Sequence, residues 1–447
     1  MIDQISPIIG ITFAGIAAGL FTGLVPSLGT FPVLCLLYVF LLGCSPLELI
    51  VFYSALLIVS QYVDAIPAVY LGVPGEISAI PTAYESKFIS NPETKQNILK
   101  WSALSRTVAC IAAIMLTWAL LSSISKFTVL FSVRVQLFLF ALALVGILIT
   151  GQNRWYVNIG LMLLGYTLGI VGYNWYIGHN VLTFGWTELQ DGFPLAPMAM
   201  GLYVIPSLWK HLTADEKPLE NYSEHQVVAG QQHFDTPVAT TARSGTIGYL
   251  LGLVPGTSFI LAGNASYNFE KWIRQKNNKY TPGDASTAVA CETGNQAGAF
   301  SSLIPLLYFG IPITAGESLI FDLMLQNGAI FQSGLFLLDN WFSLVGSFII
   351  VVTISVALSW PLAKYCLVLF QSIDSQKLLT GLIIFCIITT LYQGYSVNSL
   401  MLYSISLLLA VLIGFAIRKF DVLPALFVLI LQSSIETSVV NFVKVIN

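Results

Sequence analysis

The stretch that decides the fold runs from Gly248 to Ser318. It reads GYLLGLVPGTS over 248–258, TAVACETGNQAGAFSS over 287–302 and IPLLYFGIPIT over 304–314. Glycine and proline break helices in water, and in a bilayer broken helices persist only where the freed backbone groups face protein or a watery cavity. In secondary transporters that cavity is commonly the substrate site. The stretch therefore predicts interrupted membrane helices around a binding site, with a charged loop over 270–279.

The composition is that of a membrane protein. The 447 residues are 56% hydrophobic and 9% charged, with a mean hydropathy of +0.80, whereas soluble proteins carry about 25% charged residues. We expect the few Lys and Arg residues to sit in loops without forming a basic stripe, which argues against nucleic acid as a partner. Six scattered cysteines without a C-x-x-C pair predict buried free thiols. The first residues lack the basic segment of a cleaved signal, so we expect the first apolar run to be a retained helix.

Apolar runs of about 20 residues, the length that spans a bilayer, recur along the chain. The expected spans are 5–24, 47–71, 102–124, 129–150, 155–175, 341–356, 378–391, 400–415 and 423–440. A further apolar helix is expected over 245–253, where the second half begins. The runs 30–42 and 77–83 are too short to cross alone, and 77–83 reads as the return arm of a re-entrant hairpin. The predicted fold class is an all-α polytopic membrane protein with about 10–12 transmembrane helices. Its two pseudo-repeated halves would each contain broken helices or re-entrant hairpins.

Polarity divides the chain into three parts. We expect a first membrane half over 1–178, an interfacial segment and hydrophilic linker over 179–243, and a second membrane half over 244–447. The basic clusters 87–106, 271–279 and 418–419 are cytoplasmic candidates by the positive-inside rule.

Two sequence motifs recur in the expected halves. GLFTGLVP over 19–26 returns as GYLLGLVP over 248–255, and GVP over 72–74 has an echo in GIP over 310–312. Paired interruptions at matching places in two halves indicate a transporter binding site. The alternative is that Gly-x-x-x-Gly and proline are simply common in membrane helices. The sequence does not fix whether such repeats are parallel or inverted.

Seven short motifs follow one another over essentially the whole chain. They are GLVPSLG (23–29), LGVPG (71–75), FGWTELQDG (184–192), GLYVIP (201–206), GLVPG (252–256), ETGNQA (292–297) and IPLLYFGIP (304–312). In this order and spacing they resemble the motifs of the large membrane subunit of the tripartite tricarboxylate transporter family, such as its G-x-x-P-G-x-G, N-I-P-G and E-A-A-N-N-A. The sequence departs from the family pattern at 62–65, 85–86, 295–296 and 312–313.

The resemblance implies a secondary transporter in the cell's inner (cytoplasmic) membrane, driven by a sodium or proton gradient and needing no cofactor. In this family the subunit works with a small membrane subunit and an extracytoplasmic solute-binding protein that delivers a carboxylate. The expected substrate is a tri- or dicarboxylate-like organic anion.

The residues at the breaks predict where an anion would bind. A carboxylate needs amide donors, and helix N-termini or successive N–H groups beside glycine supply them without placing a cation in lipid. Hydroxyl and amide side chains nearby add further donors. The candidate substrate-binding residues are Ser27, Leu28, Gly29, Thr30, Pro74, Gly75, Glu76, Ser78, Gly256, Thr257, Ser258, Asn295, Gln296 and Thr314. The alternative is that these residues only cap helices and pack loops.

A coupling cation needs oxygen ligands, and unwound carbonyls beside prolines can provide them. The candidates are the acids Asp64 and Glu292 and the positions Pro26, Pro255 and Pro312. An acid at the centre of a membrane helix costs about 2.5–3.5 kcal/mol on insertion scales, so Asp64 predicts a partner or a wet cavity. Glu292 and Asn295 are three residues apart and would share a helix face. The alternative for Asp64 is a bond to nearby backbone.

Two other classes of function compete with a carrier. A membrane-embedded enzyme would need a nucleophile–base pair or an acidic metal motif within the spans. The sequence has no Gly-x-Ser-x-Gly motif, and its four histidines lie outside the clear spans without metal-ligand spacing, so we expect no enzyme. A channel or an assembly component of a membrane complex would not need duplicated broken helices. Within transport, the alternative is a stand-alone carrier for another small organic anion.

Overall fold

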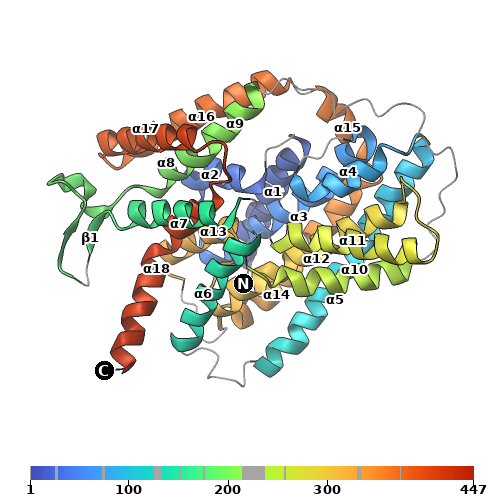
Figure 1. Ribbon diagram of the computed structural model, residues 1–447, viewed down its shortest axis with the longest axis horizontal. Coiled ribbons are helices and arrows are strands. Elements are labelled where there is room, and N and C mark those ends of the chain that lie inside the picture. Colours follow the sequence, from blue (N-terminus) through green and yellow to red (C-terminus); the bar gives the residue numbers. More distant parts are fainter. Residues whose placement is uncertain are drawn as a thin grey trace.

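Two long helices, α3 (Pro46–Leu71) and α12 (Ala285–Phe309), lie at the centre of the structure, and other helices surround them (Figure 1). In α3 every residue from Leu49 to Val69 is buried, and in α12 every residue from Ala285 to Leu303. The computed structural model describes residues 2–25, 29–72, 76–124, 133–150, 153–174, 177–213, 237–255, 258–329, 335–372 and 374–446.

Nearly all described elements are helical. Before residue 214 they are α1 (Ile2–Leu24), α2 (Thr30–Leu41), α3, η1 (Ile77–Ala79), α4 (Ile80–Ser86), α5 (Pro92–Ile124), α6 (Val133–Thr150), α7 (Trp155–Gly169), β1 (Gly172–Asn174), β2 (His179–Val181), η3 (Thr187–Asp191), α8 (Leu195–Ala199), the π-helical turn η4 (Met200–Val204) and α9 (Ile205–Thr213). After residue 236 they are α10 (Pro237–Gly252), α11 (Ser258–Lys276), α12, α13 (Ala315–Gln326), α14 (Leu335–Ser359), α15 (Ala363–Ser372), α16 (Ser375–Ser396), α17 (Leu400–Ala416) and α18 (Leu423–Ile446). The short strands β1 and β2 pair antiparallel, with Gly172 opposite Val181.

Five described helices contain a stretch long and apolar enough to cross a membrane. These stretches are Pro7–Leu24, Pro46–Leu71, Pro92–Ala119, Asp339–Ser359 and Gln376–Ser396. Shorter apolar helices include Thr30–Leu41 and Leu400–Ala416. A bilayer core needs about 20 helical residues, so α2, with 12 residues, is too short to cross alone. The all-α polytopic class is confirmed, whereas the number of spans and the internal repeat stay predictions.

Glycines allow α1 to lie directly on α3. A side chain at Gly19 or Gly23 would overlap backbone oxygens and Cβ atoms of α3. Helix α10 lies on α12 in the same way, because a side chain at Gly248 or Gly252 would overlap the backbone of α12. Small residues at four-residue spacing are a common basis of close helix packing in membranes. The motif that the sequence repeats therefore makes the same kind of contact in both places.

The two central helices also end alike. Pro67 precedes Gly72 at the end of α3, and Pro305 precedes Gly310 at the end of α12. Both glycines have positive φ values, 67° and 66°, which glycine adopts without steric cost. The N–H of each glycine donates back to the last helical turn. Each helix thus stops at a defined residue just before the next proline.

Some expected boundaries are wrong. The charged stretch 270–279 is helical up to Lys276, where α11 ends, because its charges lie on an amphipathic helix that buries Glu270 and exposes Lys276. Helix α5 begins at Pro92, ten residues before the expected span 102–124, and α10 begins at Pro237, within the expected linker. The linker residues 214–236 lie outside the described residues, and the three-part division of the chain stays a prediction.

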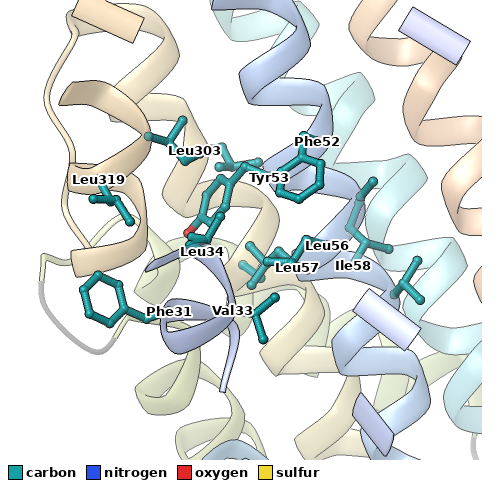
Figure 2. Packing of buried hydrophobic residues seen from close by; sticks show 14 of the residues in the cluster. Phe31, Val33, Leu34, Phe52, Tyr53, Leu56, Leu57, Ile58, Leu303 and Leu319 are labelled. Atoms are coloured by element: carbon teal, nitrogen blue, oxygen red, sulfur yellow. The ribbon is translucent and has the colours of Figure 1, made fainter. Parts of the chain in front are cut away.

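The apolar core joins residues from both ends of the chain. Figure 2 shows Phe31, Val33 and Leu34 of α2 and Tyr53, Leu56 and Leu57 of α3 beside Leu303 of α12 and Leu319 of α13. In a bilayer, close packing rather than the hydrophobic effect holds helices together. This interdigitation therefore fixes the short helices α2 and α13 against the central pair.

Candidate functional site

Arg106 on α5 is buried between α3 and α12 and forms an ion pair with Glu292 on α12. The Arg106 side chain is 1% exposed and that of Glu292 is 2% exposed. The Nη2 of Arg106 pairs with Oε2 of Glu292, and its Nε donates to the backbone oxygen of Glu292 at 3.2 Å. Removing one partner of a buried pair leaves an uncompensated charge, which costs about 3–5 kcal/mol. Each side chain therefore depends on the other.

Three further contacts hold the pair. The Nη1 of Arg106 donates to the backbone oxygen of Gln61 on α3 at 2.8 Å, and its guanidinium carbon lies 5.1 Å from the ring centroid of Tyr62. The hydroxyl of Thr82 on α4 donates to Oε1 of Glu292. The pair thus connects α3, α4 and α5 with α12. Helix α12 is far from the other three in the sequence but is their neighbour in space (Figure 1).

Buried polar side chains without hydrogen-bond partners gather near this pair. The amide oxygens and nitrogens of Gln61 and Gln296, the hydroxyl of Ser78 and the Oδ1 of Asn295 make no hydrogen bond to any described residue. These four residues are between 0% and 3% exposed. Buried polar groups are nearly always hydrogen-bonded, and each one left without a partner costs about 1–3 kcal/mol. Such a cluster is typical of a ligand-binding site.

The members of this group on α12 share one side of the helix. Residues 291, 292, 295 and 296 recur at the three- and four-residue spacing that places side chains on one helix face. On this face Cys291 donates its Sγ–H to the backbone oxygen of Ser78 at 3.4 Å, while Glu292 contacts Thr82. Cys291 and Glu292 therefore face η1 and α4, whereas Asn295 lies toward α11, where a Cβ added at Gly263 would come within 3.2 Å of the Asn295 Cβ. Gln61 on α3 is linked to Glu292 through Arg106, which donates to the backbone oxygens of both residues. We call Gln61, Ser78, Arg106, Glu292, Asn295 and Gln296 the central polar cluster.

A second polar group lies where α2 begins. The Oε1 of Glu76 accepts a hydrogen bond from the backbone N–H of Thr30 at 3.1 Å. The backbone N–H of Glu76 donates to Oδ2 of Asp64 on α3 at 3.2 Å. Two acids are thus joined one helical turn from Gln61. Their negative charge favours a cation and disfavours an anion at this point.

The second broken segment has a different local structure. The Oγ1 of Thr314 accepts from the N–H of Glu317 at 3.2 Å, and Oε2 of Glu317 accepts from the N–H groups of Ile313 and Thr314 at 2.9 and 3.2 Å. This reciprocal arrangement is a capping box that starts α13. The hydroxyl of Thr314, a candidate substrate ligand, is therefore engaged in the cap. Pro312 is buried beside it.

The remaining candidate residues divide between described and undescribed positions. Gly29 is the N-cap of α2, and Ser258 is the first residue of α11. The carbonyl of Pro255 packs so closely on Gly146 of α6 that a side chain at 146 would overlap it. Several candidates lie outside the described residues, and their roles stay predictions: Pro26, Ser27, Leu28, Pro74, Gly75, Gly256 and Thr257.

Sequence reasoning missed the role of Arg106. The sequence placed it at the end of the basic cluster 87–106, expected at the cytoplasmic surface, whereas its side chain is 1% exposed within α5. The signal was its position inside the apolar run 102–124, since a charge within a membrane span is a functional candidate. The partner could not be found from the sequence, because Glu292 is 186 positions away.

No group of three or more His, Cys, Asp or Glu side chains that could hold a metal lies within the described ranges. The six cysteines are free thiols, and all but Cys44 are buried. The prediction of buried free thiols is thus confirmed for five of the six.

Comparison with known proteins identifies the family to which the chain belongs. A family model described as the tripartite tricarboxylate transporter TctA family matches residues 9–429. The chain belongs to this family. The resemblance drawn from its motifs is therefore confirmed.

Two relatives come from Agrobacterium vitis. An uncharacterised 52.8 kDa protein in the TAR-I ttuC' 3' region is 26% identical over 322 residues, which cover 71% of this chain and 63% of that protein. An uncharacterised protein in the TAR-II ttuC' 3' region is 36% identical over 81 residues, which cover 18% of this chain and 34% of that protein. No solved structure matches the chain.

Proposed function

We propose that this TctA-family chain is the large membrane subunit of an importer for a carboxylate-type organic anion, driven by a sodium or proton gradient. In this proposal a solute-binding protein outside the inner membrane delivers the anion, and a small membrane subunit accompanies the chain. Substrate and coupling ion bind side by side within the bundle.

The central polar cluster carries the proposal. Arginine matches the geometry of a carboxylate better than any other side chain. Arg106 donates to the backbone oxygens of Gln61 and Glu292. The side-chain amides of Gln61 and of Gln296, one helical turn beyond Glu292, are buried without a partner in the described chain. The linked acids Asp64 and Glu76 lie about one helical turn from Gln61. An anion-selective group beside a cation-selective group is the arrangement that co-transport of an anion with a cation requires.

We further propose that the segments α1–α3 and α10–α12 are structural repeats whose breaks face the substrate path. The support is their shared glycine contacts and their shared Pro–Gly helix endings. Re-entrant packing of α2 and α4 is part of this proposal, since their 12 and seven residues are fewer than the about 20 needed to cross a bilayer.

Uptake into proteoliposomes tests the proposal. The full chain is reconstituted with the small membrane subunit, and radiolabelled citrate or succinate is supplied with the solute-binding protein and an inward sodium or proton gradient. We expect accumulation that requires both the gradient and the binding protein. Robust uptake by the chain alone would favour a stand-alone carrier, and flux without accumulation would favour a channel. No movement of either acid in any combination would contradict carboxylate transport.

A further inference from the structure

We propose that Glu292 is the internal counterion of an anion subsite at Arg106, and that a substrate carboxylate exchanges with Glu292 for the guanidinium. The inference rests on the proposed carboxylate transport. It adds the residues through which anion binding would be coupled to the driving cation.

The hydrogen bonds of Arg106 define which contact can be exchanged. Its Nε and Nη1 donate to backbone oxygens, those of Glu292 at 3.2 Å and Gln61 at 2.8 Å. The ring of Tyr62 covers the guanidinium. Among the described residues, the ion pair of Arg106 is the contact of Nη2 with the Glu292 carboxylate. The guanidinium is thus fixed by groups that stay in place, and an incoming carboxylate can replace only the Glu292 carboxylate.

The surroundings supply what a bound anion would need next. The amide nitrogens of Gln61 and Gln296 and the hydroxyl of Ser78 are buried donors without partners among the described residues. Further carboxylate or hydroxyl oxygens of a di- or tricarboxylate can accept from these groups. An arginine and several neutral donors recognise a polyanion without adding more positive charge to the membrane interior.

Exchange changes the state of Glu292. Without Arg106 its carboxylate is a buried charge with no counterion, which is strongly unfavourable. Thr82 still donates to it, and Asn295 and Gln296 follow it on the same helix face with amide oxygens that no described residue occupies. Carboxylate and amide oxygens suit a sodium ion, and the carboxylate alone suits a proton. Anion binding at Arg106 therefore requires a monovalent cation at Glu292, and the two binding events become coupled.

The decisive variant is Glu292→Gln, which removes the charge and keeps the shape. Binding of citrate and of succinate to the purified full chain in lipid nanodiscs is measured by calorimetry. One series varies sodium at fixed pH, and the other varies pH without sodium. For wild type we expect affinity to rise about tenfold or more with one of the two cations. For Glu292→Gln we expect tight binding without either cation and no dependence on them.

A second variant separates anion binding from folding. Arg106→Met alone leaves Glu292 buried and unpaired, so we expect this protein to be unstable. The double variant Arg106→Met/Glu292→Gln removes both charges, and we expect it to fold but to lose about a hundredfold or more in citrate affinity. Its melting temperature in detergent serves as the folding check.

The matched control is the pair formed by Arg243 on α10 and Glu270 on α11, with 2.8 Å between Nη2 and Oε2. Glu270 is also buried, at 1% exposed, but the pair lies outside the central polar cluster. We expect Glu270→Gln to keep the cation dependence of wild type.

Two results would overturn the inference while leaving carboxylate transport intact. One is a Glu292→Gln protein that binds citrate with the cation dependence of wild type. The other is a folded double variant that binds citrate as tightly as wild type, which would make the pair a structural link only. If wild type itself binds neither citrate nor succinate under any condition, both the inference and the proposed function fail.

Discussion

Glu85 at the end of α4 accepts a hydrogen bond from the hydroxyl of Tyr267 on α11, with 2.7 Å between the oxygens, although the two residues are 182 positions apart. The same carboxylate accepts from the hydroxyl of Tyr280 at 3.0 Å and from the N–H groups of Gly283 and Asp284 at 2.7 and 3.1 Å. Burial, together with the charge of Glu85, raises the pKa of Tyr280, so its hydroxyl stays protonated and donates. One buried carboxylate therefore ties the first broken segment to the connection between α11 and α12.

Replacing Glu85 is expected to destabilise the fold. In Glu85→Ala four donors lose their acceptor, and each buried group left unpaired costs about 1–3 kcal/mol. Thermal unfolding in detergent, followed by size-exclusion chromatography, should show a clearly lower melting temperature. The control is Glu93→Ala at the exposed start of α5, which should melt like wild type. Equal melting of the two variants would show that the Glu85 contacts do not stabilise the protein.

Adding one methyl group to the paired glycine helices is expected to disrupt them. In Gly252→Ala the new Cβ would overlap the backbone of Gly298, and in Gly19→Ala it would overlap the backbone of α3. Backbone atoms cannot move aside cheaply, so both variants should lower the yield of folded protein in membranes. Gly381→Ala on α16 meets nothing within 4 Å. This control should keep or raise stability, because alanine is favoured over glycine in a helix by about 1 kcal/mol. Normal yields of both α1 and α10 variants would refute the close packing.

Asn295→Ala is expected to spare stability and to impair transport. The Oδ1 of Asn295 is buried without a partner in the described chain, so its removal relieves an unpaired group. Citrate uptake per folded molecule should fall about fivefold or more, since loss of a ligand hydrogen bond to a polar group costs about 1–3 kcal/mol.

The matched control for Asn295 is Asn158 on α7, which is also fully buried. Its Oδ1 accepts from Asn153 at 2.9 Å, and its Nδ2 lies 3.4 Å from the oxygen of Ile147. Asn158→Ala should therefore lower the melting temperature while uptake per folded molecule stays unchanged. The opposite pattern, with Asn295→Ala unstable but fully active per molecule, would assign Asn295 a structural role.

Asp64→Asn is expected to uncouple uptake from the ion gradient. The amide oxygen can still accept from the N–H of Glu76, which now bonds Oδ2 at 3.2 Å, so folding should be retained. The loss of one negative charge should weaken a cation at this point, and gradient-driven accumulation of citrate should fall about tenfold or more. Asp322→Asn on α13 changes a half-buried acid bonded to Tyr38 and Gln326 and should leave the gradient dependence intact. Unchanged dependence in Asp64→Asn would remove Asp64 from the cation site.

Local sequence determined the class of the protein and the positions of its helix breaks. Hydropathy over about 20 residues decides whether a helix can cross a bilayer, and the expected runs 47–71 and 400–415 match α3 and α17 within about one residue. Gly72 and Gly310 end helices because of their own backbone freedom. The ordered motifs were sufficient to indicate the family. The extent of α11 was missed, because charges on an amphipathic helix resemble those of a loop.

Only the tertiary structure decided which polar residues meet. Arg106 pairs with Glu292, and Glu85 with Tyr267 and Tyr280, across 186, 182 and 195 positions of the chain. Hydropathy cannot reveal these pairs, because it does not tell which face of a membrane helix is turned toward lipid and which toward another helix. The neighbours of α12 follow instead from where glycines permit close approach and where side chains interlock. That packing brings an arginine expected at the surface into the interior, beside the acid that neutralises it.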